Sequence, residues 1–304
     1  MTAALGIFGF PHWATVLIVT ILMGFMVIQG RYWTWEKIAL AFCIINLIYI
    51  PAAFLVNPNW GEVLRIGLVP HFPGGLTGTM FFFLMANVGT TIAPWMVFFQ
   101  QSAVVDKNLK EKDIPWGQLD TAIGAFFTVL VAIFCIVVTA AVLYGVNIQS
   151  AAEAAVALMP FSKYAGTLLA IGLFDAGFLG AICISLSSSW AVGEVFGWAH
   201  SLNNKVKEAP WFYAVYFGML VSAGIVVLIP GAPLVTITLF IQVAATTLLP
   251  AALVFLILLL NSEELMGKYK NSRIQNVINF TIVIALILLA TGYSLTTLFP
   301  NWLH

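Results

Sequence analysis

The sequence predicts an all-α polytopic membrane protein with about eight transmembrane helices. Three observations support this fold class: 62% of the 304 residues are hydrophobic, only 8% are charged, and the apolar residues form long runs. An average soluble domain carries about 25% charged residues, and a soluble surface of this size needs more charge than this chain has. The composition therefore excludes a soluble enzyme, a nucleic-acid-binding protein and a disordered chain. Long runs in place of short alternating strands also exclude a β-barrel.

A helix needs about 20 apolar residues to cross a bilayer. Eight stretches meet this requirement in chain order: Trp13–Gly30, Ile38–Val56, Leu76–Val105, Thr121–Asn147, Tyr164–Gly193, Trp211–Pro230, Leu234–Leu260 and Val277–Phe299. Seven of them contain no charged residue, whereas the fifth contains Asp175. Cys43, Cys135 and Cys183 lie inside these runs, without the spacing of a disulfide framework or a zinc site.

The basic residues predict the orientation of the spans. Loops after odd-numbered spans share one side of the membrane, and that side holds ten of the twelve basic residues: Arg31, Lys37, Lys107, Lys110, Lys112, Lys205, Lys207, Lys268, Lys270 and Arg273. The other side holds only Arg65 and Lys163. By the positive-inside rule the basic side is cytoplasmic, so we expect both termini outside. No basic residue precedes Trp13, which argues against a signal peptide.

The connections between spans are short, and we expect a single membrane domain over residues 1–304. The longest external connections are Asn57–Gly75 and Ile148–Lys163. The second is rich in alanine and predicts a short surface helix, with Glu153 as a solvated charge. No Walker motif, nucleotide-binding loop or hydrolytic triad is visible, so we do not expect an enzyme. The sequence leaves the oligomeric state open.

The third span predicts a broken helix. Its middle carries Gly89, two threonines and Pro94, and proline removes a backbone donor and clashes with the preceding turn. Backbone carbonyls freed in this way must be buried or line a polar cavity. In transporters such breaks surround a substrate or a cation, although a simple proline kink is the alternative. The polar residues around the break are Asn87, Thr90, Thr91, Gln100, Gln101 and Ser102.

A second polar cluster lies in the seventh span, where Gln242 and Thr246 are four residues apart and so share a helix face, with Thr247 and Pro250 beyond them. These side chains belong either to a binding site or to a hydrogen-bonded contact between helices. The same choice applies to Asp175, which is either a functional acid or a structural one paired with a backbone or hydroxyl group. Glu194 is expected at the cytoplasmic end of its span, as a vestibule or interface charge.

The broken helix resembles the sixth helix of the Nramp divalent-metal transporters, whose pattern is Gly-Ala-x-Val-Met-Pro-His. The residues here are Gly89-Thr90-Thr91-Ile92-Ala93-Pro94-Trp95. Three other segments also resemble the family: Gln242-Val243 with Pro250, Leu265-Met266-Gly267 with Asn271, and Gly172–Glu194 with its run Ser185–Ser189. The resemblance covers nearly the whole chain. It implies the family's helices four to eleven, as part of a leucine-transporter-type fold of inverted five-helix repeats.

Departures from the family pattern change the implied metal. The family's metal-binding methionine corresponds to Ala93, and a thioether is a soft ligand that favours transition metals such as manganese, iron or cadmium. The resemblance then implies a metal site of oxygen donors from Asn87, Thr90, Thr91, Ala93 (through its backbone) and Gln242. Oxygen ligands suit Mg²⁺, and this variant is similar to the Nramp-related magnesium transporters. We expect Mg²⁺ or Mn²⁺ as a transported substrate, and no cofactor.

The family's histidines on this helix are absent as well. Trp95 follows the proline, and Gln100 or Gln101 takes the place of the second histidine. Histidine titrates near neutral pH, whereas tryptophan and glutamine cannot relay a proton. We therefore expect no proton coupling through this helix.

The family's first three helices, whose first member supplies an acidic ligand and an asparagine, have no counterpart here, so we expect an incomplete transport site. The resemblance implies transport of a divalent cation by alternating access, in the bacterial cytoplasmic membrane. Its partners would be the metal ion and the lipid bilayer, with no nucleic acid. Three alternatives stay open: a proton-coupled Mn²⁺/Fe²⁺ Nramp transporter, an amino-acid transporter of the same architecture, and a truncated, non-transporting membrane remnant.

Overall fold

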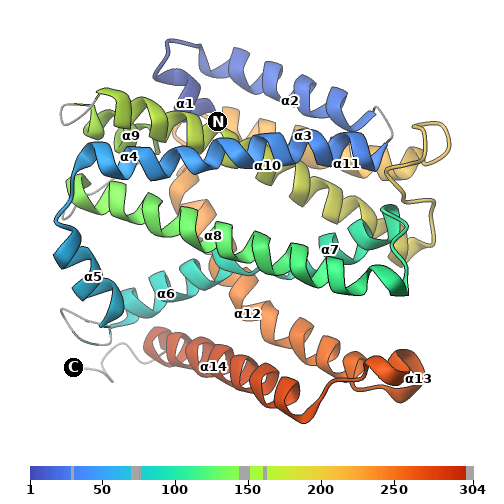
Figure 1. Ribbon diagram of the computed structural model, residues 1–304. Helices are drawn as coiled ribbons and strands as arrows, with labels where there is room; N and C mark the ends of the chain where they lie inside the picture. Colours follow the sequence, from blue (N-terminus) through green and yellow to red (C-terminus); the bar gives the residue numbers. More distant parts are fainter. Residues whose placement is uncertain (29–30, 70–74, 76, 144–150, 160–162, 299–304) are drawn as a thin grey trace. The chain divides into compact units, whose positions relative to one another are not determined.

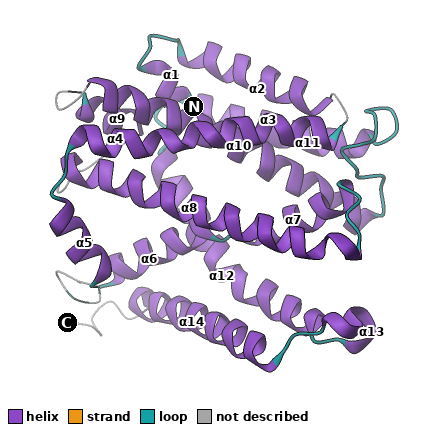
Figure 2. Cartoon of the chain, viewed as in Figure 1, coloured by secondary structure: helices purple, strands orange, loops and turns teal. Residues whose placement is uncertain are grey.

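The computed structural model describes residues 1–28, 31–69, 75, 77–143, 151–159 and 163–298 (Figure 1). All regular structure in these residues is helical, which confirms the predicted all-α class (Figure 2). The chain contains two compact groups of helices. Unit 1 comprises Met1–Val69 and Phe98–Ala232, and unit 2 comprises Pro70–Val97 and Pro233–His304. A single membrane domain over residues 1–304 stays a prediction.

Unit 1 is built around one long helix, α10. Its helices are α1 (Thr2–Gly6), α2 (His12–Ile28), α3 (Tyr32–Ile45), η1 (Asn46–Ile48), α4 (Tyr49–Val56), α5 (Trp60–Leu68), most of α7 (Pro94–Asp106), η2 (Glu111–Asp113), α8 (Ile114–Leu143), α9 (Ala151–Leu158), α10 (Lys163–Phe196) and α11 (Pro210–Leu228). Phe178, Ile182, Leu186 and Trp190 recur every four residues along α10, so they share one face. All four are buried in a core with residues of α2, α3 and α11.

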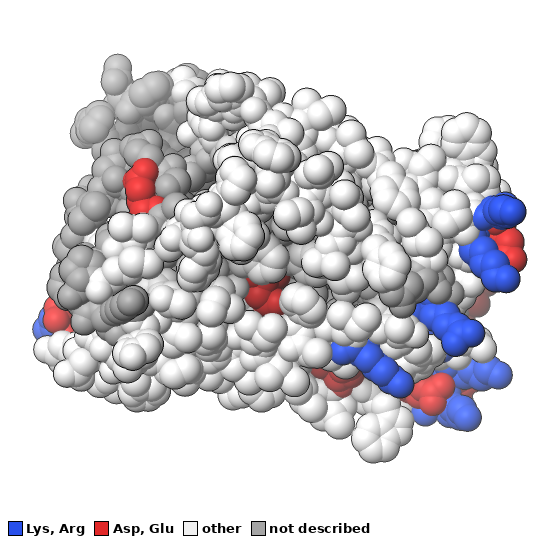
Figure 3. Space-filling model, turned by 90° about the horizontal axis from the view of Figure 1, so that it is seen from above, with Lys and Arg blue, Asp and Glu red and all other residues white. Residues whose placement is uncertain are grey.

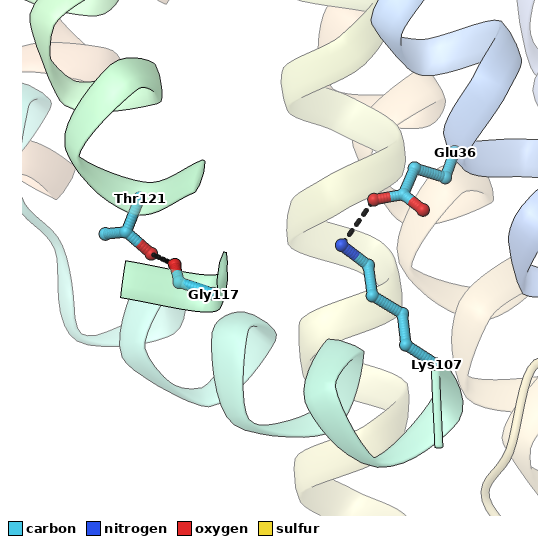
Figure 4. A network of polar contacts seen from close by, with 4 residues as sticks. All are labelled: Glu36, Lys107, Gly117 and Thr121. Atoms are coloured by element: carbon cyan, nitrogen blue, oxygen red, sulfur yellow. Dashed lines mark hydrogen bonds and ion pairs between the residues drawn. The ribbon is translucent and has the colours of Figure 1, made fainter. Parts of the chain in front are cut away.

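Three loops meet at one end of unit 1. Lys107, after α7, forms an ion pair with Glu36 of α3 (Figure 4). The amide of Asn203, after α10, accepts a hydrogen bond from the Tyr32 backbone N–H at 3.1 Å and donates to the Asp106 carbonyl at 2.8 Å. These loops follow the first, third and fifth predicted spans, so their meeting supports the predicted alternation. Most of the face drawn in Figure 3 carries no charged side chain.

Unit 2 is a smaller group in which three helices pack against one another. Its elements are α6 (Gly78–Thr91), the first turn of α7, α12 (Leu234–Leu260), α13 (Glu263–Met266), η3 (Gly267–Tyr269) and α14 (Arg273–Leu298). Each pair among α6, α12 and α14 is in contact. Met85, Ala86 and Val243 form the buried centre of this contact.

Within the described residues, seven helical stretches are long and apolar enough to cross a membrane. They correspond to the second to eighth predicted spans: Tyr32–Val56, Gly78–Asp106, Glu111–Ala141, Tyr164–Phe196, Pro210–Leu228, Leu234–Leu260 and Arg273–Leu298. The first predicted span corresponds to α2, which has 17 helical residues; residues 29–30 lie outside the described part. The helix of the fourth span begins earlier than expected. Thr121 is internal to α8, and its hydroxyl donates to the Gly117 carbonyl at 2.8 Å (Figure 4).

Two short helices lie in the long connections. The predicted helix within Ile148–Lys163 is present as α9, and its Glu153 is exposed as expected. The connection Asn57–Gly75, for which no secondary structure is predicted, contains the helix α5. The Asn59 side chain caps it by accepting a hydrogen bond from the Glu62 backbone N–H at 3.3 Å.

Candidate functional site

The predicted break in the third span is present, and it is two residues long. Helix α6 ends at Thr91, Ile92 is extended with φ −139° and ψ 114°, and Pro94 begins α7. The Ala93 carbonyl accepts a hydrogen bond from the Met96 N–H at 3.0 Å and so caps α7. Pro94 has no N–H, which leaves the carbonyl four residues earlier, on Thr90, without its usual helical donor. The backbone opens at Ile92 and Ala93, after the glycine and both threonines.

Three predicted ligands lie on the last turns of α6, and each side chain is bonded to its own helix. The Thr90 hydroxyl donates to the Ala86 carbonyl at 2.9 Å, and the Thr91 hydroxyl donates to the Asn87 carbonyl at 2.9 Å. The Asn87 amide nitrogen donates to the Phe83 carbonyl at 2.9 Å. All the donated hydrogens point back along the helix. The oxygen lone pairs of these side chains therefore stay free to accept, as a cation requires.

Helix α12 approaches α6 closely at Gly89. A Cβ added to Gly89 would collide with the carbonyl oxygen of Gln242 and would lie 2.6 Å from the Thr246 hydroxyl oxygen. That hydroxyl donates to the Met85 carbonyl at 2.7 Å. Gly89 lies within the helix, so its conformational freedom is not needed there. Its lack of a side chain leaves the space that the close approach of α12 requires. The structure thus brings Gln242 beside the turn that carries Thr90.

Three polar residues of α12 differ in their contacts. Thr246 is fully buried and bridges two helices, which is the interhelical contact that the sequence analysis weighed. The hydroxyl of Thr247 is directed into its own helix, where it donates to the Val243 carbonyl at 2.9 Å. Gln242 is half-buried. Within the described part of the chain its side-chain amide makes no hydrogen bond, so it remains available to a ligand.

The glutamines and the serine of α7 do not belong to the break. Gln100 and Gln101 follow Ala93 by seven and eight residues, about 10–12 Å along a helix. The Gln101 amide donates instead to the Glu194 carboxylate at 3.4 Å, within unit 1. Glu194 therefore faces a polar neighbour, as expected of an interface charge. Closeness in sequence alone placed Gln100, Gln101 and Ser102 with the break. The rise of helix α7 separates them from it.

Asp175 belongs to unit 1, where the side-chain amide of Asn46 donates to its carboxylate at 2.5 Å. This partner could not be predicted from local sequence patterns, since Asn46 is 129 residues away along the chain.

The donor set at the break carries no negative charge. Among the described residues no group of three or more His, Cys, Asp or Glu side chains could hold a metal ion. Unit 2 contains two acids, Glu263 and Glu264, and both are exposed on α13, beyond the end of α12. The atoms that the break offers to a ligand are thus neutral oxygens. Such a set favours a hard cation that keeps part of its water shell.

Comparison with known proteins identifies one family. Residues 1–296 match the family described as "Natural resistance-associated macrophage protein-like" (Nramp). The divalent metal cation transporter MntH of Clostridium acetobutylicum is 24% identical over 255 residues, which is 81% of this chain and 56% of that protein. The natural resistance-associated macrophage protein 2 homolog of Dictyostelium discoideum is 26% identical over 321 residues, which is 98% of this chain and 48% of that protein. The chain spans about half the length of these relatives.

Proposed function

Because the chain belongs to the Nramp family and is an integral membrane protein, we propose that it serves the transport of divalent metal ions, with the α6–α7 break as its part of the ion site. The proposed ligands are Asn87, Thr90, Thr91 and Gln242 through their side chains, and Ala93 through its backbone. The proposed mechanism is alternating access, in which the site faces one side of the membrane and then the other.

The observation that supports Mg²⁺ as the preferred ion is the residue at the break itself. Ala93 stands where the family pattern carries methionine, so the break offers no sulfur. The neighbouring hydroxyls direct their hydrogens into the helix and leave oxygen lone pairs for a cation. Mg²⁺ prefers oxygen ligands and retains several waters, for which the small alanine leaves room. Mn²⁺ tolerates the same donors, so we include it as a second substrate.

We further propose that metal transport does not depend on proton movement through α7. Trp95 and the two glutamines stand where the family pattern carries histidines, and none of the three can exchange a proton near neutral pH. The lack of proton coupling through α7 distinguishes the proposed function from its nearest alternative, a proton-coupled Mn²⁺/Fe²⁺ transporter.

The absence of a carboxylate from the donor set at the break has an energetic consequence for binding. Moving a divalent ion into a low-dielectric site costs several kcal/mol even after relaxation, and neutral oxygens return only part of that cost. We propose that a carboxylate from outside unit 2 completes the site, as the family resemblance implies for an acidic residue and an asparagine of the family's first helix. Ion affinity of the isolated chain should then be weak.

Substitution of Ala93 by methionine tests this function. The full-length protein is reconstituted in liposomes, and uptake of Mg²⁺, Mn²⁺ and Cd²⁺ is compared. Ala93→Met should shift preference toward Cd²⁺ and Mn²⁺, because it adds a soft ligand. Ala285→Met adds the same thioether at an exposed position of α14 and should change nothing. Unchanged selectivity in Ala93→Met would mean that Ala93 does not contact the ion.

A further inference from the structure

Asp175 is an acid buried in the middle of α10, and among the described residues it forms no ion pair with a lysine or an arginine. It is 1% exposed. Neither its own span, Tyr164–Gly193, nor the facing span, Ile38–Val56, contains a lysine or an arginine. An ionised carboxylate in such surroundings is costly unless a positive charge accompanies it.

A 3₁₀ turn in the facing span supplies the hydrogen-bond donor to this carboxyl group. Between α3 and α4 the helix tightens into the 3₁₀ turn η1, which begins at Asn46. The Asn46 side chain donates to Asp175 Oδ2 at 2.5 Å. The other oxygen, Oδ1, is buried and has no hydrogen-bond partner among the described residues. One carboxylate oxygen is therefore held in place, while the second is left to accept a ligand.

Close packing and aromatic rings shut this position off from water. Gly172, one turn before Asp175, lies against the Tyr49 ring so closely that an added Cβ would be 2.7 Å from its hydroxyl oxygen. Phe178 stacks on Phe42 with ring centroids 5.2 Å apart. Of the titratable groups on the described elements packed against α10, Cys43 and Tyr49 interact electrostatically with Asp175, and the Met1 amino group lies beside Gly177. The other such groups on these elements are His12, Tyr32, Glu36, Lys37, Glu153, Tyr213 and Tyr216, and α10 itself carries Cys183.

We propose that Asp175 and Asn46 form a buried site for one monovalent cation, H⁺ or Na⁺, which is occupied in the folded protein. The cation binds Asp175 Oδ1, and Asn46 holds Oδ2. Because the surrounding rings supply few further oxygens, H⁺ is the favoured occupant: it forms an O–H bond that turns the carboxylate into a neutral carboxylic acid. Unfolding exposes the acid to water, which then takes the proton. The site lies in unit 1 and stands independently of the divalent-ion site proposed in unit 2.

The experiment measures the thermal unfolding of the purified chain in detergent, with and without Asp175→Asn. The asparagine keeps the shape of the side chain and needs no cation. If H⁺ is bound, the folded state holds one proton more than the unfolded state, so stability falls as pH rises. From about pH 5 to 8 the folding equilibrium of the unmodified chain should fall by up to about tenfold per pH unit relative to the variant. That corresponds to about 2–4 °C in the unfolding temperature per pH unit.

A second arm distinguishes Na⁺. Replacing Na⁺ by choline at constant pH and ionic strength should lower the unfolding temperature of the unmodified chain, and not that of Asp175→Asn, if the occupant is Na⁺. Asp120→Asn removes an exposed acid on α8 and should leave both responses as they are in the unmodified chain. Either a pH response or a Na⁺ response that disappears only in Asp175→Asn supports the proposal.

Infrared spectroscopy supplies a readout that does not depend on stability. A protonated Asp175 gives the carbonyl stretch of a neutral carboxylic acid, which Asp175→Asn removes and Asp120→Asn keeps. If Asp175→Asn fails to fold, Asn46→Ala takes its place, because loss of the amide donor shifts that band. Identical pH and Na⁺ responses in all chains, together with no carboxylic acid band, would show that Asp175 holds no cation and that the proposal is wrong.

Discussion

Gly89→Ala tests the contact that joins the break to α12. The added methyl carbon would collide with the carbonyl oxygen of Gln242. It would also lie 2.8 Å from the carbonyl carbon of Gln242 and 2.6 Å from the Thr246 hydroxyl oxygen. The carbonyl belongs to the backbone and cannot rotate away, so the two helices must separate. Overpacking of this kind costs about 1–3 kcal/mol.

Two smaller effects accompany the overpacking. Separation of the helices weakens the bond from Thr246 to the Met85 carbonyl, which contributes about 1 kcal/mol. Alanine is a better helix former than glycine by about 1 kcal/mol, which offsets that loss. The free energy of unfolding should therefore fall by about 1–3 kcal/mol.

The assay is denaturant-induced unfolding of the purified chain in mixed micelles, followed by tryptophan fluorescence. Gly124→Ala is the matched control, since Gly124 lies within α8 with nothing within 4 Å of its added Cβ. It should be neutral, or more stable by up to about 1 kcal/mol. Adding Thr246→Ala to Gly89→Ala should not restore stability, because the clash with the backbone carbonyl persists. Equal stability of Gly89→Ala and Gly124→Ala would refute the close approach of these helices.

Three further predictions concern the rest of the chain. With the native cysteines removed, cysteines at the exposed positions Lys207 and Arg65 should be labelled from opposite sides of the membrane; labelling of both from one side would contradict the span count. Asp106→Ala removes the acceptor of two 2.7 Å bonds, one from the buried Leu202 N–H, and should lower the free energy of unfolding by about 2–4 kcal/mol. The exposed Asp120→Ala should change it by less than about 0.5 kcal/mol. Metal uptake by liposomes that contain the full-length protein should not acidify their lumen; a metal-dependent proton flux above the leak would disprove uncoupled transport.

The sequence predicted the features that depend on neighbouring residues. Apolar runs predicted the helices, and Pro94 after two threonines predicted the break, because a missing N–H acts on the same turn of backbone. Contacts between residues far apart in the sequence could not be predicted from local patterns. No local pattern links Asn46 to Asp175, and the role of Gly89 depends on which helix lies opposite it. The helix α5 was not predicted, although Asn59, directly before Trp60, is a capping residue that marks its start.

The neutral donor set at the break has an electrical consequence. If its oxygens belong to amide, hydroxyl and carbonyl groups, no mobile charge of unit 2 travels with the ion, and each crossing moves two full positive charges through the membrane field. One elementary charge gains about 2.3 kcal/mol per 100 mV. A potential of about 100 mV, negative inside, would then favour inward movement of a divalent ion by about 4.6 kcal/mol, which is more than three powers of ten in concentration ratio. On the proposed function, membrane voltage alone is a sufficient driving force for uptake.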